Sequence, residues 1–363
     1  MLMLENSLAN TPQATDAWIN HHDSSSAAFS KNKKHDWQGK PYHPISRHYR
    51  ECFGTKVFKV SVSVAETCPN REGLNGSKIC SFCDEWGSAA YHLERDKPLS
   101  EQIKINREAI RKRYRAERFL VYFQAYTNTL GKVQRLQDWF DAALMEKDVV
   151  GIVLGTRPDC LPSRVLKLFQ EYSERTYLSV ELGIQTLDDD QLDFLSRGHG
   201  SQCSLDAIDK LKEIPGLNVC AHLIFGIPGE TDEQLIETAR VLSAKKIDGV
   251  KLHNLHVLQG TPLEQIFSKG DFAPLSLEEY TRKVALFLEY LDPSVAVHRL
   301  AAVASRWNEL LAPEWNREKM RPMQFIEDYM RNNQMFQGRL SEKNLLNFCH
   351  RQNRSFNQES VSE

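Results

Sequence analysis

Long hydrophobic runs, a strong net charge and a secretory signal are all missing from this 363-residue sequence. Without a run of eighteen apolar residues, the chain has no segment typical of a membrane-spanning helix. A formal net charge of −2 argues against a surface that is basic all over, although a local basic patch remains compatible with it. Eight cysteines spread along such a chain suit a reducing compartment better than a disulfide framework, so we expect a cytoplasmic protein.

Three regions differ in composition. Residues 1–43 are rich in Ser, Asn, His and Thr, and have too few apolar residues to form a core, which predicts a flexible extension. Residues 44–300 have the pattern of one folded domain. Residues 301–363 are predicted to form a C-terminal helical extension that ends in a polar tail.

The middle region alternates between strand-like and helical patterns, which is typical of an α/β fold with a parallel sheet and right-handed crossovers. Its span of about 240 residues suits a β/α barrel. Seven strand candidates rather than eight predict an incomplete, open barrel. These candidates are residues 57–62, 119–126, 151–155, 177–185, 218–226, 249–257 and 295–300.

Four of these strands place polar side chains on the face that should point into the barrel. In the strand 177–185, Glu181 and Gln185 alternate with apolar residues that would meet the helices. The same alternation turns three further polar pairs inward: Tyr122 with Gln124, Cys220 with His222, and Lys251 with His253. A single inward polar residue is common in a core, but four strands with this pattern predict a hollow, polar-lined barrel.

A cysteine-rich loop follows directly after the first strand. It contains Cys68, Cys80 and Cys83, with eleven residues between the first two and two between the last pair. Three thiolates could belong to a zinc site completed by His92, although a second CxxC pair is missing. They could also hold a [4Fe–4S] cluster with one iron left open for a chelating small molecule such as S-adenosylmethionine (SAM). Burial as small hydrophobic residues fits poorly with a polar, glycine-containing loop.

Eight ordered segments carry a resemblance to a known family: FGTKVFKVSVSVAETCPNREG, CSFCDE, GTRPDCLP, VELGIQT, SRGH, HLIFGIPGET, DGVKLHNLHVLQGTPL and LLAPEW. Over residues 44–338 the chain resembles radical SAM enzymes of the YhcC-like family. That family is related to the Elongator catalytic subunit and, more distantly, to oxygen-independent coproporphyrinogen oxidase. The common CxxxCxxC spacing is not met, but relatives of the Elongator subunit also lengthen the first gap. The resemblance implies the open barrel of the radical SAM fold.

The resemblance also implies ligands for both cofactors. Cys68, Cys80 and Cys83 would hold the [4Fe–4S] cluster. Gln185 matches a residue that contacts the SAM ribose in relatives, and Arg197 matches one near the SAM carboxylate. A GGE signature for the SAM amino group is missing, so Gln124 and Thr127 are candidates by position alone. The full set of candidate SAM-binding residues is Gln124, Thr127, Glu181, Gln185, Arg197, His222 and Gly226.

Some of these candidates have simpler explanations. His222 occupies the place of a ribose-binding aspartate, which puts its role in doubt. Gly226 would let the backbone approach adenine, but its GIPG segment is also typical of a turn. Arg197 could cap a helix, and Gln185 could join strand to loop.

The implied reaction begins with an electron from a low-potential donor. The reduced cluster would cleave SAM into methionine and a 5′-deoxyadenosyl radical, which abstracts a hydrogen atom from the substrate. Cys160 is a weak candidate for a thiol relay, and a structural role is favoured for it.

The leading substrate hypothesis is a tRNA base, because the Elongator subunit acts on a wobble uridine. About 60 residues follow the barrel, too few for an acetyltransferase domain, so chemistry with acetyl-CoA is not expected. The basic helix 101–118, helped by Lys31, Lys33 and Lys34, could contact phosphates. A solvated helix face explains the same charges. A small metabolite or a protein substrate is the alternative, as is a non-catalytic metal-binding module. The sequence does not indicate the oligomeric state.

Overall fold

The computed structural model describes residues 37–87, 95–304 and 307–341. The chain divides into two compact units, Met1–Gly39 and Lys40–Glu363, and the second contains the fold. Most of the extension expected over residues 1–43 lies outside the described residues. In the described part of the chain, no helix is both long enough and apolar enough to cross a membrane.

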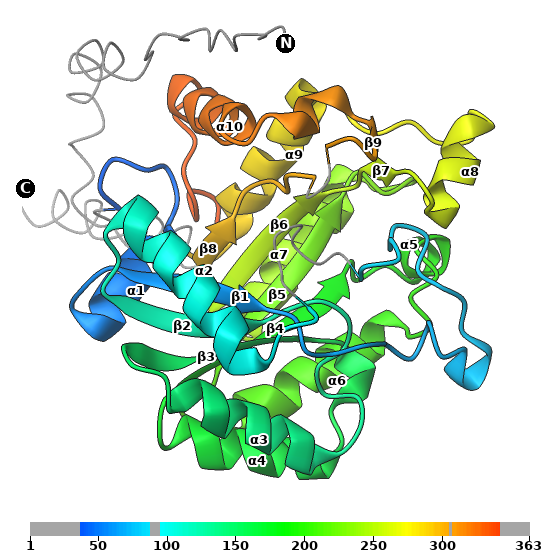
Figure 1. Cartoon of the computed structure of the whole chain (residues 1–363). Helices are drawn as coiled ribbons and strands as arrows, with labels where there is room; N and C mark the ends of the chain where they lie inside the picture. The colour runs from blue at the N-terminus through cyan, green and yellow to red at the C-terminus, as the bar shows by residue number, and fades with distance from the viewer. Residues whose placement is uncertain (1–36, 88–94, 305–306, 342–363) are drawn as a thin grey trace, which may run out of the picture. The chain divides into compact units, whose positions relative to one another are not determined.

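Seven parallel strands form one sheet in which every strand lies beside its neighbour in sequence (Figure 1). The strands are β1 (Val57–Val62), β2 (Arg118–Phe123), β3 (Val149–Thr156), β4 (Tyr177–Gln185), β5 (Asn218–Phe225), β6 (Gly249–Asn254) and β8 (Ala296–Arg299). Each agrees with an expected strand to within a few residues. Seven parallel strands in sequential order make the open barrel of the radical SAM fold, so the predicted fold class is confirmed.

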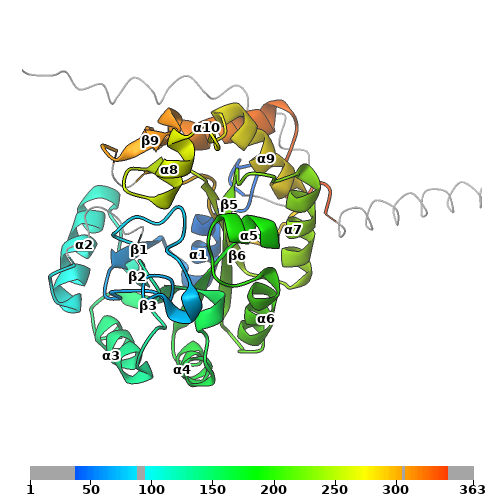
Figure 2. The same cartoon turned by 90° about the vertical axis from the view of Figure 1, so that its right-hand side faces the viewer.

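Helices surround the outer face of the strands, as Figure 2 shows along the barrel. Those between the strands are α2 (Leu99–Tyr114), α3 (Val133–Leu144), α4 (Ser163–Ser173), α5 (Asp189–Phe194), α6 (Ser201–Lys212), α7 (Asp232–Ala244), α8 (Pro262–Ser268) and α9 (Leu277–Tyr290). The helices α1 (Ile45–Phe53) and α10 (Arg321–Asn332) flank them, and a small antiparallel sheet joins β7 (Val257–Leu258) to β9 (Leu310–Ala312). The described part of the chain also contains three single-turn helices: η2 (Leu74–Gly76), η3 (Pro158–Cys160) and η4 (Glu314–Arg317).

The main core lies between the strands and the longer helices α2, α3, α4, α6, α7 and α9, whereas α5 and α8 contribute to a second, smaller apolar cluster. In β4 the four apolar side chains on the helix side, Leu178, Val180, Leu182 and Ile184, are completely buried in this core. Thr231 forms the expected capping box with Gln234 at the start of α7. Because the apolar face of each strand meets a helix, its polar face is left to line the barrel.

The two edge strands, β1 and β8, do not pair with each other among the described residues. Next to β8, Pro44 forms a parallel bridge with Val297, and the Val297 N–H donates to the His43 carbonyl at 2.7 Å. The side chain of Gln337 accepts a hydrogen bond from the His43 N–H at 2.8 Å. Residues 40–44 therefore pack with the barrel, and the compact unit that contains it begins at Lys40.

Candidate functional site

A cavity of about 340 Å³ lies inside the barrel, toward the carboxyl ends of the strands. Its wall includes Cys68, Cys80 and Cys83 from the loop after β1. Most of the candidate SAM-binding residues line it as well: Gln124, Thr127, Glu181, Gln185, Arg197 and His222. Residues that are up to 154 positions apart in sequence thus meet in one place, as the alternation of polar residues in the strands predicts.

The loop that carries the cysteines is fixed by contacts with two distant segments. The Ser81 N–H donates to the Leu195 carbonyl at 3.0 Å, and the Ser81 carbonyl accepts from the Leu263 N–H at 2.8 Å. Asn70 Nδ2 donates to the Ser196 carbonyl at 2.7 Å. A Cβ atom at Gly198 would lie 2.8 Å from Ser77 Oγ, so a glycine is needed where this turn meets the loop.

Hydrogen-bond donors surround two of the three thiols. Cys80 Sγ lies 3.3 Å from both Asn70 Nδ2 and Arg197 Nη1, and Cys83 Sγ lies 3.7 Å from Arg71 Nη2. Such donors stabilise negative charge on sulfur. Among the described residues, no fourth cysteine lines the cavity, and His92 lies outside the described residues. Three sulfur ligands beside cationic donors fit a [4Fe–4S] cluster with one open iron.

Arg197 is held in place by a second arginine. Its Nη2 donates to the Gly183 carbonyl at 2.8 Å, and its own carbonyl accepts from Arg157 Nη2 at 2.7 Å. Arg157 also makes two hydrogen bonds of 2.8 Å to the Asp159 carboxylate. Burial alone would raise the pKa of Asp159, but the hydrogen bonds and charge of Arg157 hold this pKa below its usual range. The arrangement fixes the Arg197 guanidinium beside Cys80.

The backbone at Gln185 is unusual. Its φ is +73°, in the left-handed region, and the register between β4 and β5 shifts between Gly183 and Gln185. A Cβ atom at Gly183 would lie 2.9 Å from Gln185 Nε2, so the glycine makes room for this side chain. In the part of the chain that the structure describes, the Gln185 side chain has no hydrogen-bond partner. Strain at a polar residue beside a cavity is typical of ligand-binding positions.

Two further polar atoms in this region are buried without a partner among the described residues, Gln124 Nε2 and Thr127 Oγ1. Both residues line the cavity. The two residues between them on this segment, Ala125 and Tyr126, have φ values of +69° and +50°. Since a buried polar group without a partner destabilises the fold, this segment is suited to a polar ligand.

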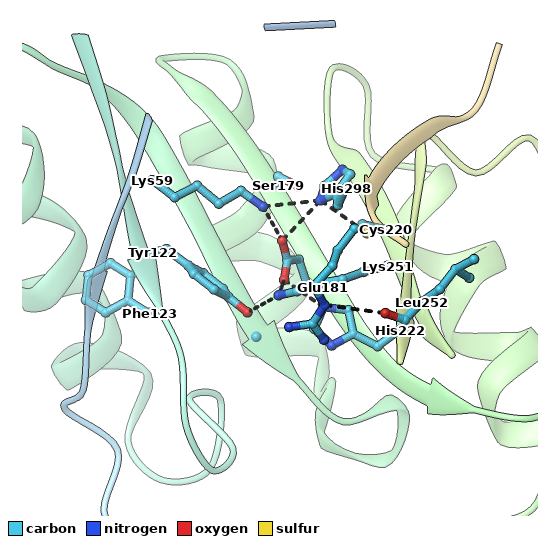
Figure 3. Close-up of polar contacts among 12 residues, drawn as sticks. Lys59, Tyr122, Phe123, Ser179, Glu181, Cys220, His222, Lys251, Leu252 and His298 are labelled. Atoms are coloured by element: carbon cyan, nitrogen blue, oxygen red, sulfur yellow. Dashed lines mark hydrogen bonds and ion pairs between the residues drawn. The ribbon is translucent and has the colours of Figure 1, made fainter. Parts of the chain in front are cut away.

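A buried carboxylate organises the interior of the barrel (Figure 3). Glu181, which is 1% exposed, forms an ion pair with Lys59 and accepts a hydrogen bond from Lys251 Nζ at 2.8 Å. Its Oε2 lies 2.7 Å from His222 Nε2, and its Oε1 lies 3.3 Å from His298 Nδ1. Four side chains from four other strands therefore converge on this carboxylate, which ties opposite walls of the open barrel together. We call these five residues the Glu181 cluster.

Electrostatics in the Glu181 cluster favour a charged carboxylate and neutral imidazoles. Burial would raise the pKa of Glu181, but the charges of Lys251 and Lys59 hold it well below its usual value. Burial lowers the pKa of His222 to about 4 and that of His298 to about 3. Burial also lowers the pKa of Lys251 to about 8, although Glu181 opposes this change. His222 is therefore bound to a protein carboxylate, which argues against the ribose role of the aspartate it replaces.

Sequence reasoning missed Lys59 and His298, although a signal for both was present. Alternation along β1 turns Lys59 away from Val60, and β8 ends in a polar pair that contains His298. The same rule that identified Glu181 would have identified them. Gly249 also belongs to this arrangement, because a Cβ atom there would lie 2.5 Å from His298 Nε2.

Two sequence candidates do not line the cavity. Gly226 has a φ of +87°, and its N–H donates to Glu230 Oε2 at 3.0 Å, so the glycine serves a turn in this structure. Cys160 is buried in η3, and burial together with the neighbouring Asp159 raises its pKa to about 12. A thiol in this position is protonated at neutral pH, which favours a structural role.

The basic helix 101–118, which was expected to contact phosphates of a substrate at the active site, has its basic end far from the cavity. The basic end of α2 precedes β2, and Arg118 pairs with Val57 at the starts of two parallel strands. The cysteine loop follows the other end of β1, so this basic end lies at the opposite end of the barrel. Arg107 pairs with Glu146 at 3.3 Å, and Arg111 pairs with Asp148 at 3.0 Å. Lys31, Lys33 and Lys34 lie outside the described residues.

Comparisons with known proteins agree with this architecture. Residues 62–242 match the family model of the radical SAM superfamily, and residues 247–332 match the model of a radical SAM C-terminal domain. The chain is 35% identical to the uncharacterized protein YtqA of Bacillus subtilis, a match that covers 84% of this chain and 94% of YtqA. It is also 35% identical to YhcC of Escherichia coli, with 77% and 88% of the two chains covered.

More distant similarities include one to a protein whose name refers to tRNA. The tRNA uridine(34) acetyltransferase of Dehalococcoides mccartyi is 32% identical over 155 residues, which is 42% of this chain and 33% of that protein. Among solved structures, Elp3 of Methanocaldococcus infernus superposes with a TM-score of 0.59 at 18% identity. That superposition covers 77% of this chain and 64% of Elp3. At this identity, the likeness shows a shared fold.

Proposed function

Because this chain belongs to the radical SAM superfamily, in the group of YtqA and YhcC, we propose that Cys68, Cys80 and Cys83 bind its [4Fe–4S] cluster. Enzymes of this superfamily use such a cluster together with SAM. The observation that carries the assignment is that all three thiols line one cavity together with polar atoms that have no hydrogen-bond partner among the residues described.

The bound cofactors supply reductive cleavage of SAM and a radical that removes a hydrogen atom from the substrate. The residues of the protein bind and orient the two cofactors. Asn70 and Arg71 donate to the sulfur atoms of Cys80 and Cys83. Arg197 presents its guanidinium to a carboxylate, and the strained Gln185 presents its amide to a hydroxyl group. Gln124 and Thr127 complete the polar wall.

For the substrate, we propose a tRNA base. One relative is named as a tRNA uridine(34) acetyltransferase, and its similarity to this chain covers 42% of the chain. A base would have to leave its stack to enter the cavity, at a cost of a few kcal/mol. Exposed cations are present at the end of the barrel where the cavity lies: Lys78, Lys132, Arg135 and Arg164. Lys78 lies in the cysteine loop, and the other three precede or begin helices that follow the carboxyl ends of strands, so phosphates near the mouth would meet them.

We expect that replacing Gln185 by alanine weakens SAM binding without removing the cluster. One hydrogen bond to a neutral group is worth about 1 kcal/mol, which corresponds to a roughly fivefold rise in Kd. Binding of SAM to the reconstituted protein can be measured by equilibrium dialysis, with iron content determined on the same samples. Gln134→Ala, on the outer surface of α3, is the matched control. Unchanged affinity in Gln185→Ala would remove this residue from the SAM site.

The tRNA proposal predicts that alanine substitutions in two matched pairs of cations have different effects on tRNA binding. Lys132 and Arg135 lie at the cavity end of the barrel, whereas Lys112 and Arg113 lie at the opposite end. Both pairs are exposed, and each arginine packs over an aromatic ring, at 5.0 Å and 5.2 Å respectively. Each lost phosphate contact should lower the slope of log K against log salt by roughly 0.7 to 0.9.

We therefore expect Lys132→Ala with Arg135→Ala to weaken tRNA binding and flatten this slope by about 1.4 to 1.8. Lys112→Ala with Arg113→Ala should have a smaller effect. Filter binding over a series of salt concentrations measures both. If tRNA does not bind at low salt, or if both pairs behave alike, the tRNA proposal fails and a small-metabolite substrate is favoured. Profiling of modified tRNA nucleosides in cells with and without the protein gives an independent answer.

A further inference from the structure

Two cations face each other across neighbouring strands inside the barrel. Lys251 on β6 pairs in register with Arg299 on β8, and both side chains line the cavity. His222 on β5 pairs with Lys251 from the other side. Like charges directly opposite on adjacent strands destabilise a sheet unless something compensates them. The positive charges of Lys251 and Arg299 are compensated in different ways.

Lys251 has a charged partner, whereas Arg299 has none in the part of the protein that the structure describes. Lys251 Nζ donates to Glu181 Oε2 at 2.8 Å and to the Tyr122 hydroxyl at 2.9 Å. The Arg299 side chain makes one hydrogen bond among the described residues, a weak one of 3.4 Å from Nε to the Leu252 carbonyl. No carboxylate lies within ion-pair distance of Arg299 in the described part of the chain. Its two Nη atoms, each a strong donor, have no acceptor within residues 37–87, 95–304 and 307–341.

Among the described residues, the carboxylates that line the cavity are Glu181 and Asp84, and both have partners. Glu181 contacts two lysines and two imidazoles, and Asp84 Oδ1 accepts a hydrogen bond from the Trp86 N–H at 3.0 Å. Burial lowers the pKa of Arg299, and it lowers the pKa of Lys251 to about 8, with Arg299 contributing to the latter. A nearby anion would favour the charged form of both groups and raise both pKa values again. A buried guanidinium with free donors in a cavity wall is suited to a carboxylate or phosphate.

We propose that Arg299, together with Lys251, forms a subsite that binds an anionic group of the substrate. The group is a carboxylate or a phosphate, since both match the planar donor face of a guanidinium. This inference rests on the proposed function in one respect, that the cavity is the active site. The subsite is distinct from the one at Arg197, which lies beside Cys80, because Arg299 belongs to the edge strand β8. The substrate and SAM then have separate anion sites in one cavity.

The test uses the reconstituted full chain with saturating SAM and measures the binding of two probes, inorganic phosphate and acetate, at constant ionic strength. Isothermal titration calorimetry gives the affinities. At least one probe should bind to the wild type, and the preferred probe identifies the chemical class of the group. Arg299→Gln should weaken binding of that probe about tenfold or more, and Arg299→Lys should keep most of the affinity. Arg240→Gln, at an exposed position on α7 outside the cavity lining, is the matched control and should change nothing.

Four results would overturn the proposal. The first is that neither probe binds to the wild type. The second is equal binding to the wild type and Arg299→Gln. The third is a loss of SAM affinity in Arg299→Gln with competition between the probe and SAM, which would assign Arg299 to SAM. The fourth is that Arg299→Lys and Arg299→Gln bind the probe equally weakly and both have an altered near-ultraviolet circular dichroism spectrum. That result would assign a structural role to Arg299. Failure of SAM cleavage alongside normal anion binding would contradict the proposed function and leave this subsite standing.

Discussion

Replacing Cys68 by alanine is expected to abolish cluster assembly and SAM cleavage. A [4Fe–4S] cluster contains about four irons, and with one of three thiolates removed the site has too few ligands to hold it. Iron content after anaerobic reconstitution should fall from about four per chain to below about one. Formation of 5′-deoxyadenosine with a low-potential reductant should fall to background. The barrel should stay folded, since Cys68 belongs to none of the packed hydrophobic clusters of the core.

Cys203→Ala provides the matched control, because this residue lies on α6, away from the cavity lining. Its iron content and activity should equal those of the wild type. Far-ultraviolet circular dichroism of both variants separates loss of the cluster from loss of the fold. Full iron uptake by Cys68→Ala, or stoichiometric zinc without iron in the wild type, would contradict the assignment of the three cysteines.

The barrel and its polar interior could be predicted because strand periodicity is a local property. Alternation along β4 alone places Leu182 against the helices and Glu181 inside, and both placements are confirmed. Lys59 and His298 follow the same rule, so they could have been placed inside the barrel as well. The cluster loop could be located by its cysteines and by its position after a strand. Their roles as cluster ligands stay a prediction.

Partners within the interior could not be predicted, because they depend on the curvature of the sheet. Nothing in the sequence indicates that Lys59 and Lys251, on β1 and β6, share one carboxylate on β4. The position of the basic helix, in contrast to these contacts, could have been predicted. A helix that precedes a parallel strand must end where that strand begins, so the location of Arg118 far from the cavity follows from topology alone. The pairing of Arg111 with Asp148, by contrast, depends on a loop conformation that only the structure reveals.

Replacing Glu181 by alanine is expected to produce the largest loss of stability among single changes in the barrel interior. The variant would leave Lys59 and Lys251 inside the barrel without their shared counter-charge. Removal of one partner from a buried ion pair typically costs about 3 to 5 kcal/mol. The free energy of unfolding in urea should fall by about this amount at pH 7. Ser179→Ala is the matched control on the same strand, because it removes one neutral hydrogen bond of 3.0 Å to Asn218, worth about 1 kcal/mol.

The cost of Glu181→Ala should depend on pH through Lys251. In the wild type the pKa of Lys251 is about 8, below the value near 10.5 of an exposed lysine, so the folded state releases this proton first. At pH values between these two pKa values the unfolded chain binds more protons than the folded state, and the free energy of unfolding therefore rises with pH. Glu181 raises the pKa of Lys251, so in the variant this pKa should fall further and the window should extend below pH 8. The variant should thus recover part of its lost stability between pH 7 and pH 9.

A loss of the same size at pH 7 and pH 9 would contradict this account, because the charge left on Lys251 would then have no part in the destabilisation. Lys251→Met in the Glu181→Ala background separates the contribution of Lys251 to the lost stability from that of Lys59, since methionine has a similar length and carries no charge. If the unpaired Lys251 charge causes the loss, the double variant should be more stable than Glu181→Ala at pH 7, and the difference should shrink at pH 9. A double variant less stable than Glu181→Ala at both pH values would instead mean that Lys251 supports the fold through Tyr122, to which it donates at 2.9 Å.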